Sequence, residues 1–126
     1  MYNFLLICLL TFQMSQENIL REGKYYIDLD DHHQFFQLVG NYIELCHKNG
    51  YQNFACLYKD LFIHMCLKGR FIMIKQFYNL FIQLSIVDQI ALKSMFPYCL
   101  ALARKKKDKE MVQWLESIRT KYNKLD

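Results

Sequence analysis

The sequence predicts an all-α protein of antiparallel helical hairpins, with five to six helices in a repeat-like bundle or a short α-solenoid. Two observations favour this fold class. Apolar residues recur at three- and four-residue steps along most of the chain, as they do on one face of a helix. In addition, the 126 residues include only four Gly and one Pro. So few helix breakers favour long helices joined by short turns over a sheet punctuated by loops.

The first regular helix is predicted over residues 32–48, where apolar side chains repeat along one face. Asp30 or Asp31 suits its N-cap, because a carboxylate accepts the free N–H groups of a first helical turn. Asn49-Gly50 would end it, since Gly readily adopts the left-handed conformation at a helix C-terminus.

Two further helices are predicted over about 52–67 and 71–84. Lys68-Gly69 separates them with the same kind of stop signal. The second of the pair reads FIMIKQFYNLFIQL and is apolar on most sides, so we expect it to lie between neighbours.

Ser85 opens the next segment, which Pro97 should kink or break near Met95 because proline removes a helical hydrogen bond. A final helix is predicted after Asp108, its expected N-cap, with Glu110 in the first turn.

Residues 1–23 form an apolar N-terminal segment for which we expect a helix docked on the core. MYNFLLICLLTF is about half as long as a bilayer span and has no Lys or Arg before its apolar run. A secretory signal over residues 1–13 and a true start at Met14 are the alternatives. Residues 24–31 are predicted to be an extended linker, because polar and apolar residues alternate there.

The length of the chain and the distribution of its charge restrict the possible domain organisation and partners. A chain of this length predicts one helical domain over 1–126, with a three-helix unit over 32–84 and a basic hairpin over 85–126. Residues 1–84 carry seven Lys/Arg against seven Asp/Glu, whereas residues 85–126 carry nine against five. This asymmetry is typical of contact with an acidic partner, a nucleic acid or a membrane surface.

The cysteines have no paired short spacing and lie in apolar segments, where Cys behaves as a small buried hydrophobe. This pattern predicts a reducing compartment, cytoplasmic or nuclear, in preference to secretion. The five are Cys8, Cys46, Cys56, Cys66 and Cys99.

Two groups of residues carry candidate chemistry, and each has a simpler interpretation. DLDDHH (28–33) combines acids and imidazoles, but Asp at a helix start is typically a cap. Cys46-His47 and His64-x-Cys66 could ligate zinc, but neighbours on a helix point apart, so we expect no metal or cofactor. Phosphate-loop and nucleophile-elbow motifs are missing from the sequence, which favours a protein that is not an enzyme.

The clearest internal similarity joins MCLKGRFIMIKQF (65–77) to ARKKKDKEMVQWL (103–115), with Met65 aligned to Ala103. Both stretches end one helix, turn, and enter another. Phe77 then matches Leu115, and Met73-Ile74 matches Met111-Val112.

This pattern resembles the ankyrin repeat, in which A-C-x-x-G-x-x-E-I-V-K-W-L spans a turn and the second helix. The opening T-P-L-H motif is missing, Lys107 replaces the turn Gly, and the offset between the copies exceeds the usual period of about 33 residues. The stretch YKDLFIHMCLKGRFIMIKQFYNLF (58–81) is also similar to a tetratricopeptide or pentatricopeptide unit, whose period is about 34 residues. The ankyrin matches are Ala103, Glu110, Val112, Trp114 and Leu115 in one copy, and Cys66, Gly69, Ile74, Lys75 and Phe77 in the other.

The alternative is an ordinary bundle with two similar hairpins, because a repeat array normally needs three units. A helical repeat implies a protein–protein interaction module, an adaptor or a small subunit of a larger assembly, or a homo-oligomer. A nucleic-acid-binding module that contacts phosphates is the second hypothesis, and membrane contact through the N-terminal segment is the third. The expected binding residues are Arg104, Lys105, Lys106, Lys107, Lys109 and Trp114.

Overall fold

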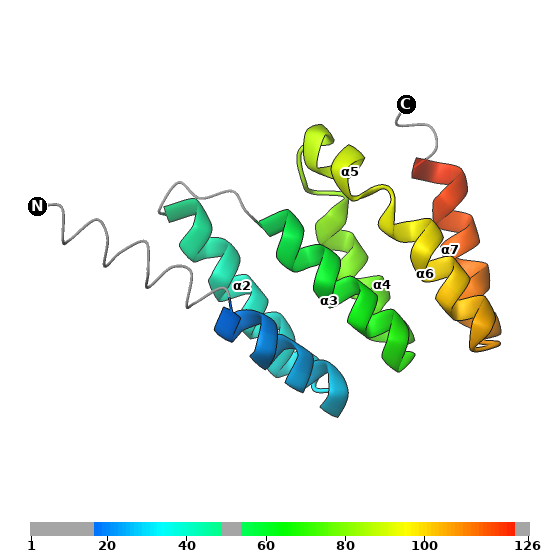
Figure 1. The fold of residues 1–126 in the computed structure, drawn as a ribbon. Helices are drawn as coiled ribbons and strands as arrows, with labels where there is room; N and C mark the ends of the chain where they lie inside the picture. The colour runs from blue at the N-terminus through cyan, green and yellow to red at the C-terminus, as the bar shows by residue number, and fades with distance from the viewer. Residues whose placement is uncertain (1–16, 49–53, 123–126) are drawn as a thin grey trace, which may run out of the picture. The chain divides into compact units, whose positions relative to one another are not determined.

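The computed structural model describes residues 17–48 and 54–122. All regular secondary structure in these ranges is helical, so the all-α prediction is confirmed (Figure 1). A helical stretch over 17–29 precedes six helices, which are α2 (His32–Lys48), α3 (Phe54–Lys68), α4 (Phe71–Phe81), α5 (Ile86–Leu92), α6 (Met95–Lys105) and α7 (Lys109–Tyr122).

The chain divides into two compact units, Met1–Leu57 and Tyr58–Asp126, where the sequence predicted a single domain. Helical hairpins bury their side chains mainly against neighbours in sequence, so contacts gather in two groups instead of around one centre. The N-terminal unit carries three Lys/Arg and six Asp/Glu, and the C-terminal unit carries thirteen and six. The boundary therefore separates an acidic unit from a basic one.

The predicted extended linker over 24–31 is wrong, because residues 24–29 are helical. Gly23 and Ile27 are buried, and their i, i+4 spacing places both on one helix face. The short alternation of polar and apolar residues is therefore compatible with a helix as well as a strand. The predictions for residues 1–16 and for Asn49-Gly50 fall outside the described residues.

Three turns share one backbone conformation. Asp30, Gly69 and Lys107 have positive φ angles of 56°, 68° and 60°. At each turn two N–H groups bond back to carbonyls three and five residues earlier, which is the Schellman pattern of a helix end. The bonds are Asp30 to Ile27 (3.0 Å) and Asp31 to Tyr26 (2.9 Å), Gly69 to Cys66 (3.2 Å) and Arg70 to Met65 (3.0 Å), and Lys107 to Arg104 and Asp108 to Ala103 (both 3.1 Å).

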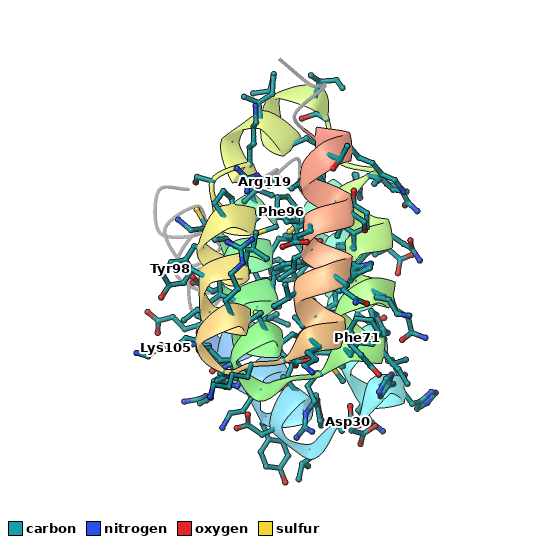
Figure 2. All side chains as sticks on the ribbon, turned by 90° about the vertical axis from the view of Figure 1, so that its right-hand side faces the viewer. Asp30, Phe71, Phe96, Tyr98, Lys105 and Arg119 are labelled. Atoms are coloured by element: carbon teal, nitrogen blue, oxygen red, sulfur yellow. The ribbon has the colours of Figure 1, made fainter. Side chains whose placement is uncertain are left out.

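A cluster of aromatic rings forms the core of the C-terminal unit and joins α3 and α4 to α6. Tyr58 stacks on Phe77 with ring centroids 4.2 Å apart, and its hydroxyl donates to the Phe77 carbonyl at 3.2 Å. Phe96, labelled in Figure 2, meets Phe62 and Phe81 edge to face at 5.5 and 5.0 Å. All five rings are at most 1% exposed.

Pro97 breaks the chain as predicted, since α5 ends at Leu92 and α6 begins at Met95. Proline is tolerated in the first turn of a helix, where its missing N–H has no intrahelical partner. Within the described ranges, Ile86–Lys105 is long and apolar enough to cross a membrane. Core helices pass the same test, and α6 buries five side chains in the protein. The stretch therefore fits a role as part of the core.

Lys107→Gly should stabilise the protein by about 1 kcal/mol, because a residue with a Cβ is strained at positive φ. Gly69→Ala should destabilise it by a similar amount. The added Cβ would lie 3.7 Å from Asp108 Oδ2, an ordinary contact, so the cost arises from the backbone. Urea unfolding followed by helical circular dichroism measures both changes. Lys107→Ala is the matched control, since it removes the same charge and keeps the strain; equal stability of the two Lys107 variants contradicts the prediction.

Candidate binding surface at two helical turns

The two turns of the C-terminal unit lie beside each other. A Cβ atom placed on Gly69, in the α3–α4 turn, would be 3.7 Å from Asp108 Oδ2, in the α6–α7 turn. The second carboxylate oxygen, Asp108 Oδ1, accepts the Met111 N–H at 3.2 Å and caps α7, as predicted. One carboxylate thus caps its own helix and packs against the neighbouring turn.

Seven cationic residues gather on these two turns and form what we call the basic turn surface. Asp108 and Glu110 are the acids among them, so positive charge dominates. All seven are exposed except Arg70, which is half-buried. Figure 2 shows Lys105 near the C-terminal end of α6 and Arg119 toward the opposite end of the helices. The seven are Lys68 and Arg70 from the first turn, and Arg104, Lys105, Lys106, Lys107 and Lys109 from the second.

The predicted site therefore gains residues that sequence reasoning missed. Lys68 and Arg70 occupy the turn that aligns with the 104–109 run when Met65 is placed on Ala103. That alignment could have pointed to Lys68 and Arg70, because equivalent turns of stacked hairpins fall on the same edge of a helical array. Their adjacency depends on how the two hairpins dock, which a single sequence does not give.

Apolar side chains flank the cations. Leu67 and Ile72, on either side of the α3–α4 turn, are 36% and 61% exposed. Lys75 lies over the Phe71 ring with Nζ 4.4 Å from its centroid, in a cation–π contact. The surface thus combines charge with aliphatic area.

Arg104 forms an ion pair with Glu116 of α7 at 2.8 Å, with both side chains about half exposed. Such a solvated pair contributes little to stability. Its effect is to hold the Arg104 side chain along α7.

Trp114 lies against the aromatic cluster and is half-buried. Its ring centroid is 6.3 Å from those of Phe62 and Phe71 and 5.7 Å from that of Tyr78. Because the Trp114 ring packs against these three rings, only the exposed part of the ring contributes to the basic turn surface.

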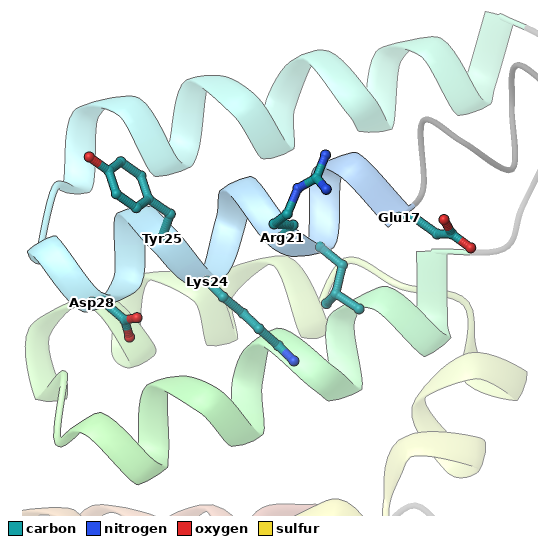
Figure 3. A pocket seen from close by; sticks show the side chains of 6 residues that line it. Glu17, Arg21, Lys24, Tyr25 and Asp28 are labelled. Atoms are coloured by element: carbon teal, nitrogen blue, oxygen red, sulfur yellow. The ribbon is translucent and has the colours of Figure 1, made fainter.

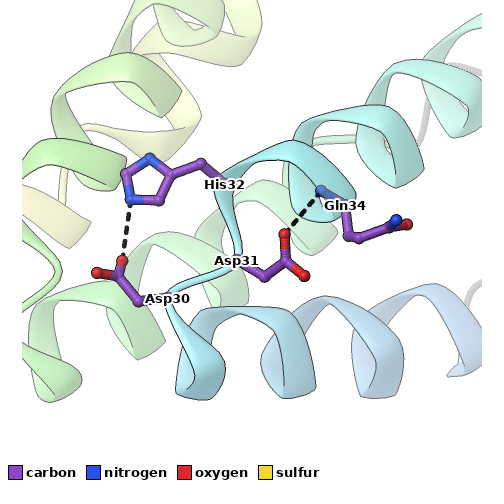
Figure 4. Close-up of polar contacts among 4 residues, drawn as sticks. All are labelled: Asp30, Asp31, His32 and Gln34. Atoms are coloured by element: carbon purple, nitrogen blue, oxygen red, sulfur yellow. Dashed lines mark hydrogen bonds and ion pairs between the residues drawn. The ribbon is translucent and has the colours of Figure 1, made fainter.

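The DLDDHH stretch ends one helix and starts the next (Figure 4). Asp31 Oδ1 accepts the Gln34 N–H at 3.1 Å, so the predicted capping of α2 is confirmed. Asp30 Oδ1 lies 2.9 Å from His32 Nε2 across the same turn. Among the described residues, no group of three or more His, Cys, Asp or Glu side chains could hold a metal ion.

A shallow depression runs along the helical stretch 17–29 in the N-terminal unit (Figure 3). Its lining side chains all come from that one helix and include two acids and two bases. The depression is an open flank of one helix and not an enclosed site, so we assign it no ligand. The lining residues are Glu17, Leu20, Arg21, Lys24, Tyr25 and Asp28.

Comparisons of the chain with protein-family models, with curated proteins and with solved structures find no match in any of the three. The basic turn surface is therefore interpreted from its own geometry.

Asp108→Ala should destabilise the protein by about 1 kcal/mol, because it removes the N-cap of α7. Asp108→Asn should cost much less, since Asn is an equally good capping residue. Both variants remove the same negative charge, so the difference between them measures the cap. Guanidinium unfolding, in which the denaturant also screens charge, gives both values. An equal loss in the two variants would mean that charge, and not capping, accounts for the effect.

Proposed function

We propose that this chain is a non-catalytic protein–protein interaction module, an adaptor or subunit whose basic turn surface binds an acidic segment of a partner protein. The observation that carries the proposal is the contact between the Gly69 and Asp108 turns. It brings the two cations of the α3–α4 turn beside the five of the α6–α7 turn, so that one surface carries all seven. Complementary charge of this kind speeds association and orients the partner.

The chemistry around the cations favours a protein partner over a nucleic acid. Leu67 and Ile72 offer exposed aliphatic area beside the charges, and protein interfaces typically combine an apolar centre with a polar rim. Binding of single-stranded nucleic acid relies on stacking of bases on exposed aromatic rings. In this unit most aromatic rings pack on one another, as Trp114 does on Phe71 and Tyr78, whereas Tyr98 on α6 is 54% exposed.

The three Schellman turns support a further part of the proposal. Asp30, Gly69 and Lys107 share positive φ and follow one another at nearly equal spacing along the chain. We propose that the three hairpins are copies of one degenerate helical-hairpin repeat, whose family the chain does not specify. Repeat proteins commonly bind partners along an edge or concave face that successive units build together.

The four described cysteines are free thiols, which suits the cytoplasmic or nuclear setting that we propose for the protein.

The direct test measures the binding of a synthetic Asp/Glu-rich peptide containing two Leu residues by fluorescence anisotropy. The double variant Lys105→Glu/Lys106→Glu should bind about tenfold more weakly or worse, because it reverses two of the seven charges of the surface. Arg119→Glu/Lys121→Glu is the matched control, with the same charge change on α7 away from the turns, and should bind nearly as the parent does.

Ile72→Ser separates the two classes of partner. It should weaken peptide binding and leave the binding of duplex DNA or single-stranded RNA unchanged, because nucleic acid contacts depend on charge. Tighter binding of a nucleic acid than of the peptide, with a steep dependence on salt, would overturn the proposal in favour of the nucleic-acid hypothesis. Affinity purification from native cells, with and without nuclease, then shows which class of partner co-purifies with the parent and not with the double variant.

A further inference from the structure

Two thiols meet in the core of the C-terminal unit. Cys66 on α3 and Cys99 on α6 are 2% and 0% exposed. Cys66 Sγ lies 3.4 Å from the Cys99 carbonyl oxygen. Both are free thiols. A thiol that lies against a second buried cysteine, on another hairpin, is the starting arrangement for a disulfide, whose S–S bond is about 2 Å long.

The other described cysteines differ from this pair. Cys46 is buried on α2, in the N-terminal unit. Cys56 is exposed and precedes Cys66 on α3 by about three helical turns. Cys46 and Cys56 therefore serve as matched controls for the pair.

The two thiols are chemically unequal. The hydrogen bond from Cys99, together with the charge of Lys106, lowers the pKa of Cys66 against the effects of burial and of Asp108. The same hydrogen bond and burial raise the pKa of Cys99. Cys66 is thus the thiol that ionises first, and the thiolate is the attacking form in thiol oxidation. Cys99 is the resolving partner.

We propose that Cys66 and Cys99 are a redox-modification site, at which a peroxide forms a reversible disulfide that links α3 to α6. The Cys66 thiolate attacks one peroxide oxygen, the O–O bond breaks, and a sulfenic acid and the first water result. The Cys99 sulfur then displaces that oxygen as the second water, and the S–S bond forms. Two thiols lose two electrons and two protons in total, and one peroxide is reduced to two waters. A dithiol reductant reverses the step by thiol–disulfide exchange.

Burial sets the conditions of this reaction. An oxidant reaches the sulfurs only when α6 moves locally away from α3, so the rate depends on local opening of the core. The same burial protects the sulfenic acid from further oxidation, because Cys99 is its nearest partner. The product would hold together the two hairpins that carry the basic turn surface, since Cys66 lies in the last turn of α3, just before Gly69. The inference does not depend on the proposed function.

The test uses the reduced full chain, treated with hydrogen peroxide, alkylated in denaturant and digested with trypsin. We expect a linked species joining Asp60–Lys68 to Ser94–Arg104, two hydrogens lighter than the sum of the two peptides and abolished by dithiothreitol. The oxidised monomer should also unfold at a Tm several degrees higher, because the cross-link restricts the unfolded chain.

Cys46→Ala and Cys56→Ala should leave the linked species unchanged, whereas Cys66→Ala and Cys99→Ala should remove it. The parent protein carries the decisive measurement, so it stands even where a core variant folds poorly. Two results overturn the proposal. One is full alkylation of Cys66 and Cys99 in the oxidised, denatured chain, and the other is a disulfide that joins either residue to Cys56 or to a second copy.

Discussion

The residue with left-handed backbone conformation at each of the three hairpin turns is the constraint on which the rest of this structure depends. Positive φ at Asp30, Gly69 and Lys107 lets two N–H groups return to the helix that has just ended and reverses the chain within a few residues. Each hairpin is antiparallel for this reason. The close turns also bring Gly69 against Asp108, where a longer loop would separate the hairpin ends. Only one of the three positions is glycine, so the other two hold their conformation under strain.

Aromatic packing in turn decides which kinds of side chain the basic turn surface exposes. Tyr58, Phe77 and Phe96 fill the space between α3, α4 and α6 with rings in stacked and edge-to-face contact. Trp114 joins the cluster from α7. With these rings engaged in packing, the turn edge presents cations and aliphatic side chains. The chemistry of the proposed interface therefore follows from the way the core is filled.

The cations have a structural role as well as a proposed binding role. Lys68 lies in the last turn of α3, and Arg104 and Lys105 lie in the last turn of α6. Positive charge at a helix C-terminus is favourable because it faces the negative end of the macrodipole. This effect explains basic residues at each helix end separately. It does not require the two turns to touch, and their contact is what makes them a single surface.

The sequence by itself determined the features that are local along the chain. Helix α2 has the bounds that its periodicity predicts, and Asp31 and Asp108 accept the N–H groups expected of them as N-caps. The basic run 104–109 and the break near Pro97 were also predicted from the sequence. These features depend on residues within about four positions of one another, where spacing alone fixes geometry. The helical state of residues 24–29 was not predicted, because a short period-two pattern also fits a helix face.

Only the tertiary structure decided that Lys68 and Arg70 join the basic run, that Trp114 packs among aromatic rings, and that Cys66 meets Cys99. Those contacts join residues that lie far apart in the chain, and they follow from how whole hairpins dock, which no local pattern encodes.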